Sequence, residues 1–113
     1  MITQVGVLPV GIEVDGVVHS EFELRPQLVR DSIEALKDER AVGNDSLFGL
    51  ALLAQQLMKL GSLQKEQITL DLLLDAYDVD MSVLMEAAAS LRERLKTFRG
   101  EASQPAQAAA TTA

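Results

Sequence analysis

The sequence predicts an α+β fold, in which an N-terminal β-hairpin packs on a small bundle of about four α-helices. Residues 6–26 alternate apolar and polar side chains around an Asp-Gly pair and end at a proline, which is typical of a hairpin. From residue 26 onward, apolar residues recur at helical spacing, and capping residues separate the segments. Because a lone hairpin is only marginally stable in water, we expect its apolar face to lie against the helices.

The turn of the hairpin decides which side chains share a face. A two-residue turn at Asp15 and Gly16 would place the apolar groups of the two strands on opposite faces. We therefore predict a three-residue connection, Val14 to Gly16, with a left-handed glycine at a bulge. This register gives three cross-strand pairs: Ile12 with Val18, Val10 with Ser20 and Leu8 with Phe22. The solvated face would then carry Glu13, His19, Glu21 and Glu23.

Composition indicates one small domain, residues 1–99, followed by a flexible tail, residues 100–113. Of the 113 residues, 48% are hydrophobic but only 4% are aromatic, so the core must consist of aliphatic side chains. The sequence contains no cysteine, which excludes disulfide bonds and thiolate chemistry. The segment from Gly100 has no large apolar residue and cannot offset the entropy cost of its own ordering.

The formal net charge of −7 makes nucleic acid an unfavourable partner, because phosphate contacts need positive charge. No apolar run approaches the roughly 18 residues that span a bilayer, and the N-terminal segment lacks the basic start of a signal peptide. We therefore expect a cytoplasmic protein that binds neither nucleic acid nor membrane. Residues 66–91 contain no Lys or Arg, and four basic residues then follow closely: Arg92, Arg94, Lys96 and Arg99. We interpret them as the C-terminal turns of a helix, where they complement its dipole.

The first predicted helix runs from residue 26 to about residue 40. Pro26 ends the strand and suits the first turn of a helix. A narrow apolar stripe of Val29, Ile33 and Leu36 should lie on the sheet. The solvated face should carry the polar residues Arg30, Asp31, Glu34, Lys37 and Asp38.

The second predicted helix begins near residue 46, after a cluster of turn residues, and ends before Gly61, a candidate left-handed cap. Phe48 and Leu52 fall within its polar half. Either a second layer of the domain buries them, or they form an exposed patch that binds a partner. Gly49 weakens the same helix by up to about 1 kcal/mol relative to alanine, so we expect another helix to pack closely there.

Two further helices complete the predicted bundle. Thr69 should cap a short helix that reaches Tyr77, and Asp78 or Asp80 should cap a last helix over residues 81–98. The last helix has one continuous apolar face, formed by Met81, Leu84, Met85, Ala88, Leu91, Leu95 and Phe98. Methionine suits both a core and an adaptable binding surface, so this face is compatible with either.

No group of residues indicates a catalytic, cofactor or metal site, and we predict a protein that is not an enzyme. His19, the only histidine, has no predicted nucleophile or second ligand beside it. The one carboxylate cluster consists of Asp71, Asp75, Asp78 and Asp80. A calcium loop starting at Asp78 would need Gly and Glu where Val83 and Ala89 stand. Helix capping and solvation explain these carboxylates better.

Taken in order, the motifs resemble the tail assembly chaperones of Mu-like bacteriophages, which have long contractile tails. The resemblance covers roughly residues 5–95 and is carried by FELRP at residues 22–26 with VRD at residues 29–31, and by LDAYDVD at residues 74–80. The linker over residues 61–67 differs, because it lacks the proline expected before the short third helix. The segment after Gly100 has no counterpart in that pattern.

The resemblance implies a small cytoplasmic chaperone of a phage or prophage. Such a protein binds the long, helical tape measure protein and keeps it soluble until tail tube subunits polymerise around it, and it is absent from the mature virion. The implied partner is therefore the tape measure protein. The tail tube protein and a second copy of this chain are further candidate partners.

The candidate partner-binding residues are Phe48, Leu52, Met81 and Met85. Leucine and methionine surfaces accept varied side chains, as the binding of a helical client in a groove requires. Two other functions stay open. One is a structural phage tail or head-tail connector subunit that is retained in the particle. The other is a small helix-turn-helix regulator, which the acidic balance disfavours.

Overall fold

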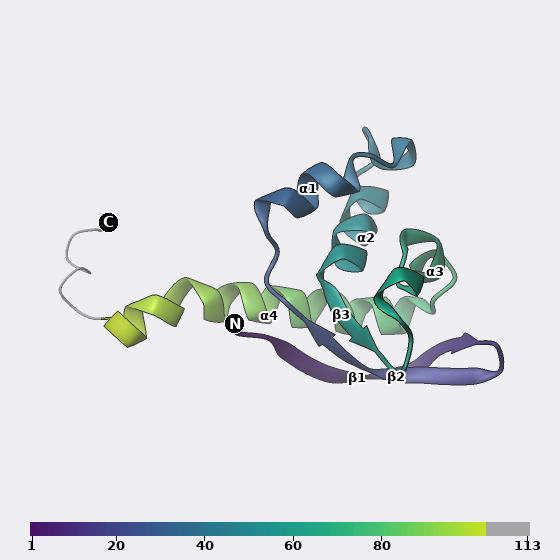
Figure 1. Cartoon of the computed structure of the whole chain (residues 1–113), viewed down its shortest axis with the longest axis horizontal. Coiled ribbons are helices and arrows are strands. Elements are labelled where there is room, and N and C mark those ends of the chain that lie inside the picture. Colours follow the sequence, from purple (N-terminus) through teal and green to yellow (C-terminus); the bar gives the residue numbers. More distant parts are fainter. Residues whose placement is uncertain (104–113) are drawn as a thin grey trace.

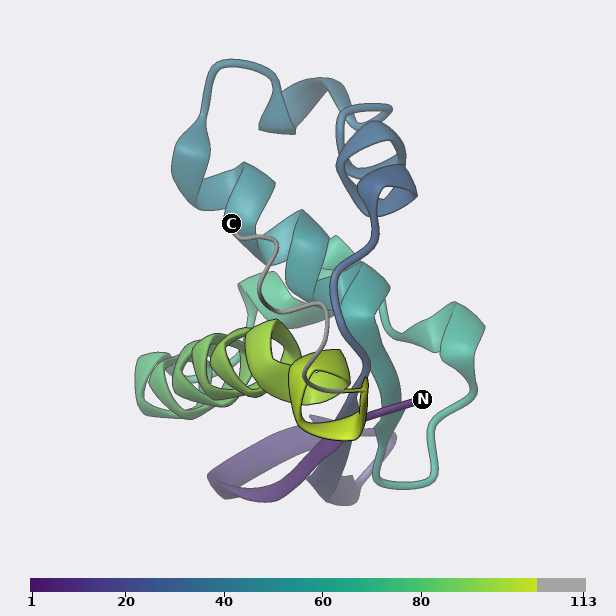
Figure 2. The ribbon, with the colours of Figure 1, turned by 90° about the vertical axis from the view of Figure 1, so that its left-hand side faces the viewer.

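The computed structural model describes residues 1–103 and confirms the α+β class (Figure 1). Three strands and four α-helices occur in this part of the chain, with two short 3-10 helices. Their order is β1 (Gln4–Val14), β2 (Val17–Leu24), α1 (Val29–Ala35), η1 (Glu39–Ala41), α2 (Asp45–Gln56), β3 (Leu57–Leu60), η2 (Lys65–Gln67), α3 (Leu70–Leu74) and α4 (Asp78–Ser103). Figures 1 and 2 both show the hairpin on one side and the helices gathered on the other.

The hairpin is joined by a third strand that the sequence pattern assigned to a helix. Strand β3 pairs with β2, so the antiparallel sheet has the order β1-β2-β3. Helix α2 therefore ends at Gln56 rather than near Gly61. Leu57 and Leu60 are both fully buried in the new strand. A short apolar run with this spacing fits a helix and a strand equally well, which is why its periodicity misled the prediction.

The predicted hairpin register is wrong. Val14 pairs with Val17, which leaves Asp15 and Gly16 as a two-residue turn. Their φ values of 52° and 81° are both in the left-handed region, as a type I′ turn requires. Leu8, Ile12 and Phe22 still share the buried face, and the register shifts further along the hairpin, between Val7 and Ile12 of β1.

That shift is a β-bulge within β1, where residues 8–11 leave the pairing with β2. The bulge turns both Leu8 and Ile12 inward, with exposed fractions of 2% and 6%. The structure thus buries only part of the face that the prediction required, because Val10 and Val18 are 47% and 56% exposed. Gly11 within the bulge has a φ of 95°, a conformation that favours glycine.

His19 is buried rather than solvated, which corrects its predicted place on the wet face. It pairs with Ile12 across the hairpin and is only 5% exposed. Its Nδ1 atom accepts a hydrogen bond from the backbone amide of Ser62 at 3.1 Å. A Cβ atom at Gly61 would lie 2.3 Å from this nitrogen, so Gly61 is needed for space as well as for its φ of 58°. Gly61 is left-handed as predicted, but it ends a strand instead of capping a helix.

The main core lies between the sheet and α4, and a smaller one joins α1, α2 and α3. The main core consists of Leu8, Ile12, Phe22, Leu24, Leu53, Ala54, Leu57, Leu60, Ile68, Leu73, Leu84 and Leu91. The small cluster is centred on Ala35, Ala51 and Leu70. Aliphatic side chains thus form nearly all of both, as composition indicated.

Helix α1 is shorter than predicted, and its predicted apolar stripe does not lie on the sheet. Val29, Ile33 and Leu36 are 85%, 60% and 47% exposed. The helix instead buries Ala35 and Asp31, the latter predicted to be solvated. An ion pair, described below, holds this helix in place of an apolar contact with the sheet.

Helix α4 is longer than predicted, and its C-terminal end extends beyond the rest of the domain (Figure 1). Leu84 and Leu91 are buried against the sheet as expected, whereas Met85, Leu95 and Phe98 are 44%, 38% and 41% exposed. The helix continues to Ser103, so the first part of the predicted tail is helical. The remainder of that predicted tail, residues 104–113, lies outside the described residues. Within residues 1–103, no helix combines the length and the apolar character needed to cross a membrane.

Candidate partner-binding cleft

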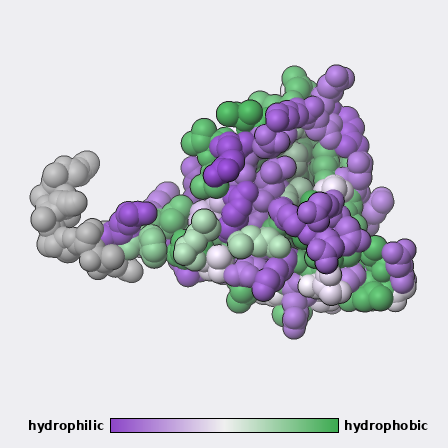
Figure 3. All heavy atoms as spheres, in the orientation of Figure 1, coloured by the Kyte–Doolittle hydropathy of each residue, from purple (hydrophilic) through white to green (hydrophobic). Residues whose placement is uncertain are grey.

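A cleft of about 800 Å³ lies between α1 and the middle of α4. Its lining comes from the linker before α1, from α1, from the end of α2 and from α4, namely Pro26, Gln27, Leu28, Val29, Ser32, Ile33, Gln56, Ala88, Ala89, Leu91, Arg92, Leu95 and Lys96. Most of these side chains are apolar. Figure 3 shows apolar side chains over α1 and again along α4 on the same face of the molecule. We call this feature the α1–α4 cleft.

The apolar walls of the α1–α4 cleft are open to water. Val29 and Ile33 line it from α1, and Leu95 lines it from α4. Their exposed fractions of 85%, 60% and 38% are high for residues at the apolar positions of amphipathic helices. Burying a side chain of this size against a partner gains about 1.5 to 3 kcal/mol, so this surface can contribute strongly to binding.

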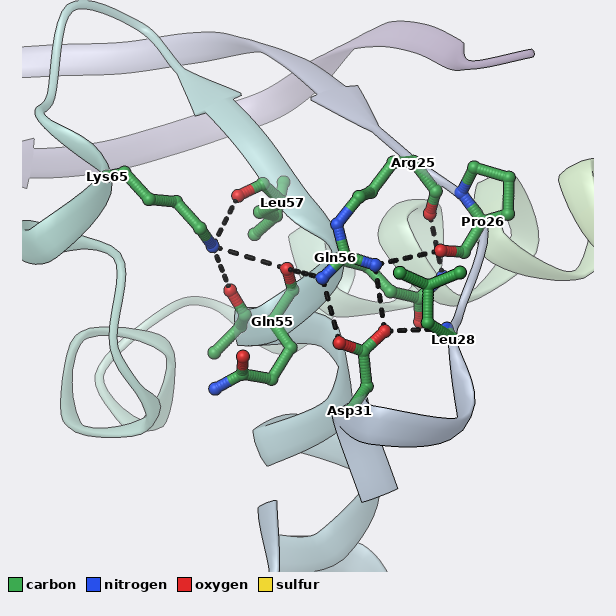
Figure 4. Close-up of polar contacts among 9 residues, drawn as sticks. Arg25, Pro26, Leu28, Asp31, Gln55, Gln56, Leu57 and Lys65 are labelled. Carbon is green, nitrogen blue, oxygen red and sulfur yellow. Dashed lines mark hydrogen bonds and ion pairs between the residues drawn. The ribbon is translucent and has the colours of Figure 1, made fainter. Parts of the chain in front are cut away.

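Helix α1 is held beside the cleft by a bidentate ion pair (Figure 4). Arg25 Nη1 donates to Asp31 Oδ2 and Arg25 Nη2 donates to Asp31 Oδ1, both at 2.8 Å. The backbone amide of Leu28 donates to the same carboxylate at 2.7 Å, at the first turn of the helix. The Asp31 side chain is only 1% exposed. The hydrogen bonds from Arg25 hold the pKa of Asp31 below its ordinary value, because they stabilise the charged carboxylate.

The same guanidinium connects α1 to the end of α2. Arg25 also donates to the carbonyl oxygens of Pro26 at 2.9 Å and Gln55 at 3.0 Å, and the Gln56 side-chain amide donates back to the Arg25 carbonyl at 3.1 Å. These bonds fix the linker before α1 against the junction of α2 and β3 (Figure 4). Polar contacts thus fix the N-terminal end of α1, Ala35 packs in the small cluster, and the large side chains of Val29 and Ile33 stay exposed.

Lys65 lies at the same junction of α2 and β3 and bonds its backbone carbonyls. Its Nζ atom donates to the carbonyl oxygens of Ala54 at 2.7 Å and Leu57 at 2.8 Å, where helix α2 gives way to β3. Burial lowers the pKa of this ammonium group, because it disfavours the charged form. The ammonium satisfies carbonyls that a longer helix would have bonded to its own amides, and so supports the early end of α2.

The basic residues lie in the C-terminal part of α4, but its last turn contains none of them, because the helix continues to Ser103. Three of them have one of two structural roles. Arg94 donates to the Thr3 carbonyl at 3.2 Å and to the Gln4 side chain, and so ties the N-terminal segment to the helix. Arg92 and Lys96 instead line the α1–α4 cleft.

The predicted carboxylate cluster is dispersed in the structure. Asp71 forms an exposed ion pair with Arg40 at 2.8 Å. Asp80 is fully buried, and its two oxygens accept hydrogen bonds from the backbone amides of Val10 at 2.9 Å and Gly11 at 2.8 Å. Asp80 therefore anchors the β1 bulge, and the prediction that it caps α4 or is simply solvated is wrong. In the described part of the chain, no group of three or more His, Cys, Asp or Glu side chains could hold a metal ion.

The four predicted partner-binding residues lie away from the cleft. Phe48 and Leu52 are half-buried against the small cluster of α1, α2 and α3. Met81 is half-buried against the main core, and only Met85 is exposed, at 44%. Their role in binding stays a prediction.

Gly49 does not sit at a close helix contact, contrary to prediction. A Cβ atom built there would have Met85 Cε as its nearest neighbour, at 3.9 Å. That is ordinary van der Waals contact, so the structure has room for a methyl group at this position.

The apolar stripe of α1 that lines the α1–α4 cleft can be read from the sequence, but the prediction places it against the sheet. A stripe on a short helix that contains only three large apolar residues is narrow enough to remain exposed. Searches against protein-family models, curated proteins and solved structures found no match to this chain.

Proposed function

We propose that this protein is a tail assembly chaperone of a Mu-like bacteriophage or prophage, which binds the tape measure protein and keeps it soluble during tail assembly. The proposal begins from the resemblance of residues 5–95 to that family. It assigns the protein to the host cytoplasm and to an assembly intermediate, with no place in the mature virion.

The observation that carries the proposal is the exposed apolar lining of the α1–α4 cleft. A chaperone for a long helical client has to offer apolar surface to water before the client arrives, and surface of this kind marks protein-binding sites. Val29 and Ile33 offer such surface on a helix whose position is already fixed by Arg25. Little conformational entropy would then be lost from α1 on binding, which favours affinity.

Co-expression with a tape measure protein of a Mu-like phage tests the proposal. We expect the tape measure protein to be recovered in the soluble fraction with this chain and to precipitate without it. Equal precipitation in both cultures would contradict the chaperone function.

Mass spectrometry of purified phage particles separates the chaperone from a structural tail or head-tail connector subunit. A chaperone should be absent from the particle, whereas a connector should be present in a fixed ratio to the other tail proteins. Its presence in stoichiometric amount would replace the proposed function with the structural one.

Replacement of both Phe48 and Leu52 by serine tests the site predicted from sequence. Loss of client solubilisation with an unchanged thermal melt would assign these residues to the client site. A strongly lowered melting temperature would assign them to the small cluster that joins α1, α2 and α3.

A further inference from the structure

We infer that the α1–α4 cleft binds one amphipathic helix of a partner protein, and that this helix carries acidic side chains beside its apolar ridge. The inference rests on the proposed function in taking the partner to be a helical client. The inference adds to the proposed function the location of the client site and the acidic side chains by which the client is selected.

The shape and lining of the cleft suit a helix. The cleft lies between two helices, α1 and α4, whose exposed side chains toward it include Val29, Ile33 and Leu95. A helix laid between two others buries apolar residues at a spacing of three and four along its own sequence. Exposed apolar side chains on both walls are suited to a ridge of that kind.

The cleft also carries positive charge. Arg92 lines the cleft, and among residues 1–99 no carboxylate lies within ion-pairing distance of its guanidinium. Lys96, one helical turn further along, lines the same cleft, and among residues 1–99 it pairs only with the exposed Glu93, at 3.0 Å. In a chain with a net charge of −7, two cations at an apolar cleft make a local positive rim. A carboxylate on the partner complements this rim, and such complementarity sets specificity.

The chain's own C-terminal segment does not supply these features. Residues 104–113 contain no acidic side chain and no large apolar side chain. A second copy would have to present a complementary acidic and apolar helix. On the exposed apolar helix α1, Asp31 is buried in the ion pair with Arg25, and Glu34 is already paired with Lys37 at 2.9 Å. A partner helix with its own carboxylates fits the cleft better than either.

Two synthetic peptides test the inference with the full-length protein. Both are helix-forming peptides of about 20 residues with one leucine ridge. One carries glutamate beside the ridge, and the other carries lysine at the same positions. Fluorescence anisotropy at low ionic strength should show the glutamate peptide binding about fivefold more tightly or better, because each exposed ion pair contributes up to about this factor. Equal affinity for the two peptides, or no binding of either, would overturn the inference.

Variants then locate the site. Arg92→Glu should reverse the preference between the peptides, and the reversal should weaken as salt is added. Val29→Ser with Ile33→Ser should weaken both peptides about tenfold or more, because exposed apolar anchors contribute most of the binding energy. Val5→Ser is the matched control, since Val5 is 70% exposed on the sheet and does not line this cleft. Its affinity should equal that of the unmodified protein. Equal losses in the control and the cleft variants would overturn the location.

Co-expression of the same variants separates this inference from the proposed function. If the unmodified chain solubilises the tape measure protein and both cleft variants do so equally well, the cleft is not the client site although the chaperone function stands. If the unmodified chain does not solubilise that client but still prefers the glutamate peptide, the proposed function fails and the cleft remains a site for an acidic amphipathic helix.

Discussion

Helices α1 and α4 have similar amphipathic sequences but are attached to the domain in different ways. Helix α4 is held by apolar contacts, with Leu84 and Leu91 buried against the sheet. Helix α1 is held by the ion pair of Asp31 and by the small side chain of Ala35, while its large apolar residues Val29 and Ile33 face water. An apolar stripe therefore does not by itself predict what a helix packs against. Where an ion pair supplies the attachment, the stripe becomes available for another molecule.

The largest expected effect lies on the α4 side of this comparison. Leu84→Ala should lower the free energy of unfolding by about 3 to 4 kcal/mol, because Leu84 is fully buried and alanine would leave a cavity. Ile33→Ala should change it by no more than about 0.5 kcal/mol, since Ile33 is 60% exposed. Urea denaturation of both variants measures the two values. A large loss for Ile33→Ala would place that residue in the core.

Removal of the charge that holds α1 should have the next largest effect. Asp31→Asn should cost about 3 kcal/mol at neutral pH, because it leaves the partly buried Arg25 without its carboxylate. The pKa of Asp31 is depressed in the folded state, so the ion pair stabilises the fold above the ordinary pKa of 3.8 and is lost as pH falls through the folded value.

Denaturation curves of the unmodified protein and Asp31→Asn, recorded from pH 7 down to about pH 2, measure this dependence. The difference between the two should be largest at neutral pH and should shrink in the acidic range. A difference that stays constant with pH would contradict the ion pair as its cause.

A smaller loss of stability is expected when the carboxylate of Asp80, which anchors the β1 bulge, is replaced. Asp80→Asn should destabilise the protein by about 2 kcal/mol, because a side-chain amide NH2 group would face one of the two backbone N–H groups that now donate hydrogen bonds to the carboxylate. Hydrogen exchange of the Val10 and Gly11 amides should accelerate in the variant. Unchanged exchange at both amides would show that the bulge is held by other contacts.

The smallest effect should be a gain in stability. Gly49→Ala should stabilise α2 by up to about 1 kcal/mol, because the added methyl group has room and alanine favours a helix. Gly61→Ala is the matched control and should destabilise the protein, since its Cβ would overlap His19 and its φ is 58°. Thermal melts of both variants measure this contrast, and a destabilised Gly49→Ala would show that α4 packs more closely there than the structure indicates.

The sequence supplied the fold class and most of the elements, because their local signals are strong. The Asp-Gly turn marks the hairpin, and Thr69 caps α3 through the Leu72 amide as predicted. What it could not supply depends on contacts between distant segments. The two oxygens of Asp80 bond residues about 70 positions earlier in the chain, and nothing near Asp80 signals those partners.

The candidate site was missed for the same reason. Arg25 and Asp31 are close in sequence, but the burial of Asp31 depends also on where α2 ends, and that end was misplaced. The prediction extends the second helix to just before Gly61, so it gives α1 no polar partner there and places the apolar stripe of α1 on the sheet. A correct position for β3 would have left Val29 and Ile33 without an obvious internal partner.

The bulge in β1 has a consequence for how this domain behaves among copies of itself. Strand β1 lies at the edge of the sheet, and an open edge invites intermolecular strand addition and aggregation. At the bulge, Pro9 has no amide hydrogen to offer, and the amides of Val10 and Gly11 are already bonded to Asp80. An incoming strand would find that stretch blocked. A domain that exposes apolar side chains on its helices thereby keeps part of its own sheet edge closed to self-association.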